Sequence, residues 1–145
     1  ETFAPSERLP AICEPYQLIA KAKGLDFSFS IQGKCPVHTS KKSLEKILSN
    51  LLSNAVAYTK PGCKITVILN ARQIKIENEC TPIPPDKLAH VFEPFYRPDF
   101  ARDRKDGGNG LGLYIVDTLS KALGMPYQFE ATKNPPGMCF TLYLP

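Results

Sequence analysis

Two stretches of the sequence carry residue types that could hold a phosphorylated ligand. The first is a row of two amides and a phenol, Asn50, Asn54 and Tyr58, which follow one another at intervals of four residues. On a helix this interval stacks the side chains along a single edge. Amide oxygens suit a hard cation and its phosphates, and a tyrosine ring offers a flat surface to a base. Amides satisfied at the edge of a core would show the same spacing, so the row alone leaves both interpretations open.

The second stretch is "GGNGLGLYIV", residues 107–116, in which four glycines fall within six positions. Each glycine raises the entropic cost of ordering the chain, and an apolar run follows at once. A helix that begins there directs unpaired backbone N–H groups and the positive end of its dipole at whatever lies above Gly110 and Gly112. The bare backbone therefore predicts a phosphate site. The sequence contains no GxxxxGKS/T motif, and "GNGLG" lacks the GxGxxG spacing, so neither common nucleotide fingerprint applies. A flexible loop that merely precedes a helix is the alternative.

A charged segment, "DFARDRKDGG", precedes the glycines at residues 99–108. Its composition predicts a mobile lid, and Arg102, Arg104 and Lys105 are candidates to reach a triphosphate. Exposed basic residues that are only solvated would look the same.

The elements that must position these residues are predicted from periodicity. Helical periodicity covers residues 40–58, 86–95 and 111–123, and a short helix is predicted over residues 16–23, where Gly24 ends it after a proline-rich opening. The helix over residues 40–58 has Ser40 as its N-cap and one apolar stripe, formed by Leu44, Ile47, Leu48, Leu51, Leu52 and Ala55.

Five segments read as strands. Residues 26–33 alternate apolar and polar side chains, residues 64–69 and 72–78 are close enough to pair as a hairpin, and residues 127–131 and 138–145 form a second hairpin. Strands joined by hairpins, with the helices gathered on one face, predict an α+β two-layer sandwich.

Composition limits the classes of protein. With 145 residues, 43% of them hydrophobic, residues 1–145 are expected to form a single domain. The net charge of +4 is scattered, which does not indicate nucleic-acid binding. The five cysteines lack metal-ligand spacing and read as reduced, mostly buried thiols of an intracellular protein. No apolar run of membrane-spanning length and no signal peptide is found, and the abrupt start at Glu1 suggests a piece of a longer chain.

Three sequence motifs follow one another along the chain: "SLEKILSNLLSNAVAYT", "HVFEPFYRPD" and "GGNGLGLYIV". Together they resemble the N, F and G2 boxes of the ATP-binding catalytic domain of sensor histidine kinases, and the closing "PGMCFTLYLP" is similar to that family's final glycine-led strand. The resemblance covers nearly the whole chain. Within the family, "FEPFYRPDFARDRKDGGNGLGLYIV" is most similar to the VanS-type sensors of glycopeptide resistance.

This resemblance implies a Bergerat (GHKL) fold, with a mixed, mostly antiparallel sheet covered on one face by helices, and a mobile ATP lid. It implies that the domain binds Mg-ATP and passes the γ-phosphoryl group to a histidine on a separate dimerisation domain, for relay to an aspartate on a response regulator. The full-length protein would be a homodimer in the membrane of a Gram-positive bacterium, with this domain on the cytoplasmic face, whereas the isolated domain would be a monomer.

The resemblance also assigns roles to residues. Asn54 matches the asparagine that coordinates magnesium, Asn50 the one near the phosphates, and Tyr58 the ring on adenine; Asn50, Asn54 and Lys105 are the implied catalytic set. Further implied nucleotide contacts are Asn78, Ile83, Tyr96, Arg102, Lys105, Gly108, Gly110, Leu111, Gly112 and Leu113. Phe92 and Phe95 match the F box and are expected to pack the base of the lid.

Two positions depart from the family pattern. The usual DxGxG motif is replaced by "IENECTPIP", where Asn78 takes the place of the aspartate that accepts from the adenine amino group, because Glu77 and Glu79 point to the other face of the strand. An amide can accept that bond but can also turn and donate, which predicts weaker discrimination between ATP and GTP. Ala57 stands where many relatives carry a phosphate-contacting lysine.

The residues also bear on the reaction. Relatives that hydrolyse ATP carry a general-base glutamate one turn before the metal asparagine; Asn50 occupies that turn here, and an amide cannot take a proton from water. Phosphoryl transfer needs mainly positioning and charge neutralisation. Neither His38 nor His90 has the context of a phospho-acceptor, so the acceptor is expected on another domain. A degenerate nucleotide-sensing module without kinase activity, and a nucleotide-independent interaction domain, are the alternatives.

Overall fold

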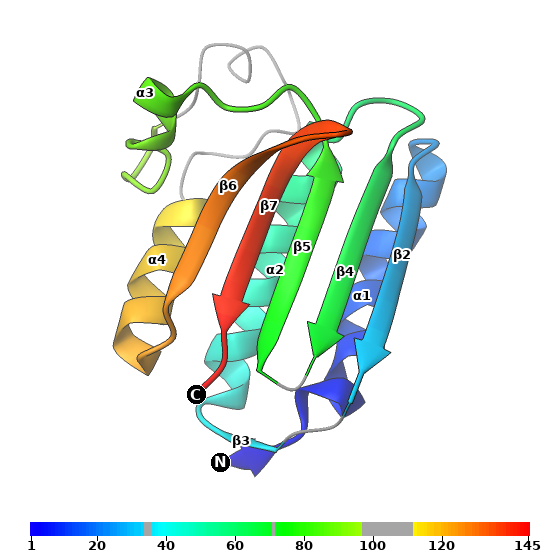
Figure 1. Cartoon of the computed structure of the whole chain (residues 1–145). Coiled ribbons are helices and arrows are strands. Elements are labelled where there is room, and N and C mark those ends of the chain that lie inside the picture. The colour runs from blue at the N-terminus through cyan, green and yellow to red at the C-terminus, as the bar shows by residue number, and fades with distance from the viewer. Residues whose placement is uncertain (34–35, 71, 97–111) are drawn as a thin grey trace.

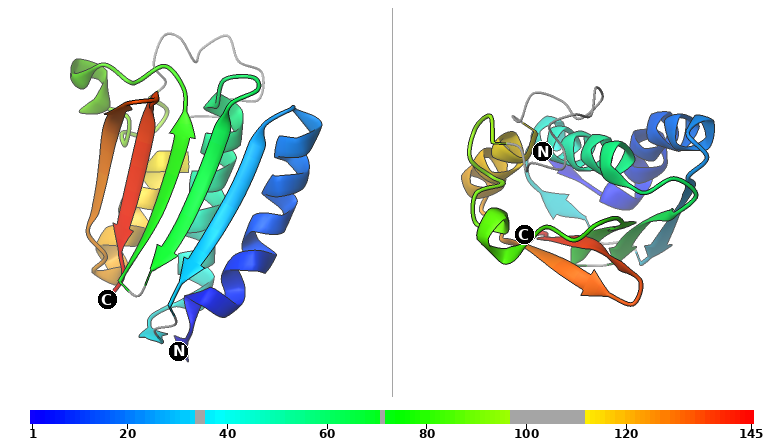
Figure 2. Two further views of the ribbon diagram at one scale, coloured as in Figure 1. Left: turned by 45° about the vertical axis from the view of Figure 1, so that its right-hand side comes forward. Right: turned by 90° about the horizontal axis from the view of Figure 1, so that it is seen from above.

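The computed structural model describes residues 1–33, 36–70, 72–96 and 112–145, and these form a five-stranded sheet with helices on one face (Figure 1). Seen from above, three helices, α1 (Pro5–Ala22), α2 (Lys41–Tyr58) and α4 (Gly112–Leu123), lie side by side on that face (Figure 2). The elements are β1 (Thr2–Phe3), α1 (Pro5–Ala22), β2 (Asp26–Gln32), β3 (Val37–His38), α2 (Lys41–Tyr58), β4 (Lys64–Asn70), β5 (Gln73–Glu79), α3 (Pro85–Leu88), α4 (Gly112–Leu123), β6 (Tyr127–Lys133) and β7 (Pro136–Tyr143).

The strands of the main sheet follow the order β2-β4-β5-β7-β6. Both predicted hairpins are confirmed, because β4 pairs with β5 and β6 with β7 in antiparallel register. β5 and β7 are also antiparallel, while β2 and β4 run parallel with α2 in the crossover between them. The sheet is therefore mixed and mostly antiparallel, and the predicted α+β sandwich is confirmed. The short strands β1 and β3 pair separately.

The core lies between the helices and the inner face of the sheet. The whole apolar stripe predicted for α2 is buried, and it packs with alternate residues of β4, β5 and β7. The N-cap is confirmed as well, since the Ser40 hydroxyl accepts a hydrogen bond from the backbone N–H of Ser43 at 3.2 Å. α2 is thus fixed along its length, and its polar edge has a defined position.

The first helix is longer than predicted. α1 begins at Pro5 and continues through Pro10 and Pro15, so the expected boundary at residue 16 is wrong. Both internal prolines are exposed, where water can reach the carbonyls that lose their partners. The opposite face of the helix buries Leu9, Cys13 and Ala20, and this packing outweighs the proline penalty.

The prediction of a helix over residues 86–95 is also wrong, because the observed helix is shorter than expected. α3 ends at Leu88, and the chain continues in turns closed by bonds from His90 N to Lys87 O and from Glu93 N to His90 O. Pro94 disfavours a helical conformation at the residue before it, and Phe95 takes a left-handed conformation with φ of 66°.

α4 begins at Gly112 and ends before Gly124, as the periodicity predicted to within one residue. None of the helices in the described part of the chain is both long enough and apolar enough to cross a membrane. Among the described cysteines Cys13 and Cys80 are buried, Cys63 and Cys139 are half-buried, and none of the four forms a disulfide. Burial raises the pKa of Cys13 to about 11.

Candidate functional site

The amide row of α2 meets the start of α4. Asn50, Asn54 and Tyr58 are all half-buried, as residues at the margin of a packed helix should be. The Asn50 side chain donates from Nδ2 to the Lys46 carbonyl at 2.9 Å, which orients the amide. Its Oδ1 atom lies 3.5 Å from the point where a Cβ atom on Gly112 would stand. The amide edge of α2 and the glycine that opens α4 are therefore adjacent across a narrow gap.

Asn54 lies one turn further along the same edge. Its side chain makes no hydrogen bond with any other residue that the structure describes, although it is half-buried. Amide groups in such positions are usually paired. Asn54 therefore has an amide without a partner among the described residues, one helical turn from Asn50 on the same edge of α2.

Several predicted site residues lie outside the described residues. These are Arg102, Arg104, Lys105, Gly108, Gly110 and Leu111. Of the residues that follow, Gly112 is the first residue of α4, and Leu113 packs against the main core. The described part of the glycine-rich region thus consists of the helix start alone.

Asn78 lies on the inner face of β5, as predicted from strand alternation. Its neighbours across the ladder are Ile65 and Met138, both of which are buried. Glu79 instead accepts a hydrogen bond from the backbone N–H of Lys64 at 2.7 Å, and Glu77 lies near the Cys139 thiol. Asn78 is therefore the polar side chain that β5 turns toward the helices at this end of the sheet.

Met138 lies next to two of the predicted nucleotide contacts, Ile83 and Asn78. Its sulfur lies 3.5 Å from the backbone nitrogen of Ile83 as a weak acceptor, and its own strand pairs with Asn78. Gly137, the preceding residue, has no room for a side chain, because a Cβ atom there would collide with the Asn78 carbonyl. The resemblance gave this glycine only as the start of the family's final strand, whereas a glycine inside a strand is a general signal for such a close approach.

The two F-box phenylalanines behave differently. Phe92 packs against Tyr127 and Phe129, with ring centroids 4.9 and 5.9 Å apart, as expected for a packing residue. Phe95 is 70% exposed, so its predicted packing role is wrong. The Tyr127 hydroxyl donates to Asp117 at 2.6 Å, and burial raises the pKa of Tyr127. Tyr96 is half-buried, and its ring lies 5.7 Å from that of His90.

The other acid and base candidates, Glu45, His38 and His90, are paired with residues outside the amide edge. Glu45 accepts a hydrogen bond from Arg8 of α1 at 2.8 Å, which holds this carboxylate on the α1 side of α2. His38, expected in a loop, lies in β3 and bonds to Thr2 at 2.9 Å. His90 is exposed and pairs with Glu93 at 2.6 Å.

Comparison with known proteins identifies the family of the chain. Residues 39–145 match the family described as histidine kinase-, DNA gyrase B- and HSP90-like ATPase. The chain belongs to this ATPase family. It is 36% identical over 134 residues to the sensor histidine kinase CusS of Escherichia coli, and these residues are 90% of this chain and 27% of CusS. It is 32% identical over 144 residues to the sensor histidine protein kinase HK06 of Streptococcus pneumoniae, or 99% of this chain and 32% of HK06.

The solved structures show the same fold. The catalytic domain of the histidine kinase ThkA in a nucleotide-free form superposes with a TM-score of 0.86 at 22% identity, covering all of this chain and 94% of that one. The chain spans about a third or less of the length of the curated relatives above. It corresponds to the ATPase domain of sensor histidine kinases, and both the α+β fold and the family predicted from the sequence are confirmed.

Proposed function

We propose that this chain, as one domain, binds Mg-ATP and transfers its γ-phosphoryl group to a histidine on a separate dimerisation domain. The observation that carries the proposal is the adjacency of Asn50 and Gly112, which brings an amide row and a helix N-terminus to the two sides of one gap. Membership of an ATPase family supports ATP as the ligand.

The residues around the gap have complementary tasks. The first N–H groups of α4 have no partner inside the helix, so they can donate to phosphate oxygens. Gly112 leaves that approach open because it has no side chain. Asn50 is oriented by Lys46 and presents Oδ1 to the same gap. Tyr58 follows on the same edge at the C-terminal end of α2, and we assign its ring to adenine.

The donor set fits magnesium. Amide and phosphate oxygens are the hard ligands that this ion prefers, and Asn54 has an amide oxygen with no partner among the described residues. When bound, Mg²⁺ neutralises charge on the transferring phosphate. Asn54 is the residue that we assign to hold it, and Asn50 lies one turn away to hold the phosphates.

Transfer is favoured over hydrolysis by the absence of a suitable base among the described residues of this edge. Glu45 is bound to Arg8 on the far side of α2, and Asn50 occupies the turn from which a base would act. The described histidines are exposed and hydrogen-bonded elsewhere, so we place the phospho-acceptor outside this chain. Relay to a response regulator, homodimerisation of the full-length protein and a cytoplasmic position at a membrane are part of the same proposal, with the isolated domain as a monomer.

The test is calorimetric titration of the 145-residue chain with a non-hydrolysable ATP analogue and magnesium. We expect Asn54→Ala to weaken binding by about tenfold or more, because a charge-assisted contact is lost. Ser49→Ala is the control, because Ser49 lies one turn after Glu45, the residue that bonds to Arg8 of α1, and this variant should bind as the wild type does. Equal affinity in the wild type and Asn54→Ala would reject the metal assignment, and no binding by the wild type would reject the function.

Transfer itself is tested by mixing the chain with ATP and the dimerisation domain of the same protein. Labelled phosphate on that domain's histidine is expected. Binding without transfer would support the alternative, a regulatory nucleotide-binding module without kinase activity. The observation behind this alternative is that Asn78 replaces the family's usual aspartate. The finer proposal of a VanS-type glycopeptide sensor rests on residues 92–116 alone, and it requires that the full-length kinase control a glycopeptide-resistance response.

A further inference from the structure

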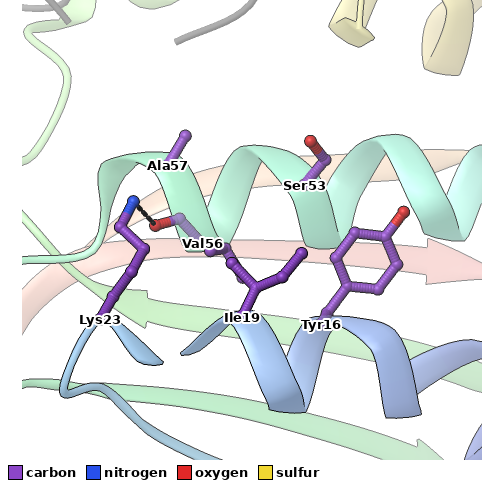
Figure 3. A pocket seen from close by; sticks show the side chains of 6 residues that line it. All are labelled: Tyr16, Ile19, Lys23, Ser53, Val56 and Ala57. Atoms are coloured by element: carbon purple, nitrogen blue, oxygen red, sulfur yellow. Dashed lines mark hydrogen bonds between the residues drawn. The ribbon is translucent and has the colours of Figure 1, made fainter. Parts of the chain in front are cut away.

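A groove of about 200 Å³ lies between the C-terminal halves of α1 and α2 (Figure 3). It is lined by Tyr16, Ile19, Lys23, Ser53, Val56 and Ala57. Ser53 follows Asn50 by three residues, and Ala57 follows Asn54 by three, so they share a helix face with the amide row. The groove therefore opens directly beside the edge to which the nucleotide is assigned.

Lys23 crosses this groove from α1 to α2. Its ammonium donates to the Val56 carbonyl at 3.2 Å, as the dashed line in Figure 3 marks. Val56 belongs to the last turn of α2, which contains no basic residue of its own. The carbonyls of that turn carry the negative end of the helix dipole, which attracts the ammonium. Lys23 thus places a positive charge at the C-terminal end of the helix that carries the amide row.

The backbone of Lys23 is firmly held. Its N–H bonds to the carbonyls of Ile19 and Ala20 at 3.1 Å. Gly24 then turns the chain with φ of 75°, and the buried Leu25 bonds back to Ala20 at 2.8 Å. This is a helix-ending turn of the kind that glycine favours. The Cα atom of Lys23 is therefore fixed, while the four methylene groups of its side chain can still change rotamer.

The ammonium lies close to Ala57, whose own side chain is buried. A peptide oxygen lies about 2.8 Å from the next Cα atom, so the bond to Val56 places the Lys23 nitrogen within roughly 6 Å of the Ala57 Cα atom. A lysine side chain spans about the same distance from its own Cα atom. The Lys23 ammonium therefore stands at a distance that a lysine at position 57 would also reach. An ammonium has three N–H groups, so Lys23 can keep its bond to Val56 while another N–H turns to a phosphate oxygen in place of a present contact.

We propose that Lys23 is a triphosphate-binding residue, which donates from the α1 side of the groove to the phosphates held on Asn50 and Asn54. This inference rests on the proposed function. The triphosphate carries several negative charges, and Ala57, on the helix that carries Asn50 and Asn54, supplies no positive charge to balance them. Lys23 supplies the cation from a neighbouring helix, and the contact distinguishes nucleotides by the number of their phosphates.

The test compares the affinities of the Mg-bound non-hydrolysable ATP analogue and of Mg-ADP for four forms of the 145-residue chain. The variants are Lys23→Gln, Lys21→Gln and the double variant Lys23→Gln with Ala57→Lys. We expect Lys23→Gln to weaken binding of the triphosphate analogue by about tenfold and of ADP by about twofold or less. Lys21 lies in the same last turn of α1 and is exposed, so its variant should match the wild type. The double variant should regain most of the lost affinity.

A capping role alone gives a different pattern. If Lys23 only stabilises the end of α2, Lys23→Gln lowers the melting temperature but leaves the ratio of the two affinities unchanged, and Ala57→Lys restores nothing. That result overturns the inference while the wild type still binds the analogue. Loss of binding in the wild type would overturn the proposed function and this inference with it.

Discussion

Gly112→Ala should separate the stability of the chain from its ligand binding. A Cβ atom at this position would lie 3.5 Å from Asn50 Oδ1, which is an ordinary van der Waals contact. The methyl group is therefore accommodated in the unliganded protein. Alanine is the better helix former, and we expect the free energy of unfolding to rise by about 0.5 kcal/mol. The same methyl group fills the gap between α4 and the amide row, so affinity for the Mg-bound ATP analogue should fall by about tenfold or more.

Gly124→Ala is the matched control at the other end of α4. Gly124 has φ of 69°, which an alanine adopts only with strain, so this variant should lose about 1 kcal/mol of stability and keep its affinity. Thermal unfolding and calorimetric titration measure both quantities on each variant. The reasoning is refuted if Gly112→Ala binds the analogue as the wild type does, or if both variants lose affinity in proportion to their stability.

Three further predictions follow from individual contacts. Asn78→Asp should raise the preference for ATP over GTP by about tenfold in competition titrations, since a carboxylate accepts from adenine and repels the guanine oxygen; an unchanged ratio would contradict the assigned role. Gly137→Ala should cost roughly 2 kcal/mol or more in urea unfolding, because its Cβ atom would collide with the Asn78 carbonyl, and a neutral effect would be inconsistent with the close approach. The buried Cys13 thiol has a pKa of about 11 against 9.0 when unperturbed, so its contribution to stability is complete below pH 9 and declines as the pH rises toward 11. Cys13→Ala should flatten that decline in unfolding curves at pH 8 and 10.5, and an identical decline in both proteins would show another group to be responsible.

The prediction of helices succeeded where the apolar period was unbroken and failed around proline. α2 and α4 were predicted closely because their stripes run without interruption. In α1 the buried residues Leu9, Cys13 and Ala20 also follow helical spacing, but Pro10 and Pro15 suggested a break. Proline is tolerated there because both rings face solvent and the opposite face packs, and that balance is set by tertiary contacts.

The site was predicted in parts, but its assembly was not. Spacing alone put Asn50, Asn54 and Tyr58 on one edge, and strand alternation put Asn78 on the inner face of β5. That the edge adjoins Gly112 depends on the packing of α2 against α4, two helices far apart in the sequence. The reach of Lys23 to Val56 is likewise a contact between helices, which no local pattern contains. The overestimate of the helix after residue 86 came from counting Phe95 as apolar and therefore packed, when its exposure is set by the turn at Pro94.

The most direct measurement of the central claim uses manganese in place of magnesium. A paramagnetic ion bound with the ATP analogue broadens the NMR signals of nuclei near it, so the assigned spectrum of the chain locates the ion. We predict that the side-chain amides of Asn54 and Asn50 and the backbone amide of Gly112 are lost together, while that of Gly124 at the far end of α4 persists. Broadening at residues remote from both α2 and the start of α4, with these three signals intact, would contradict the account.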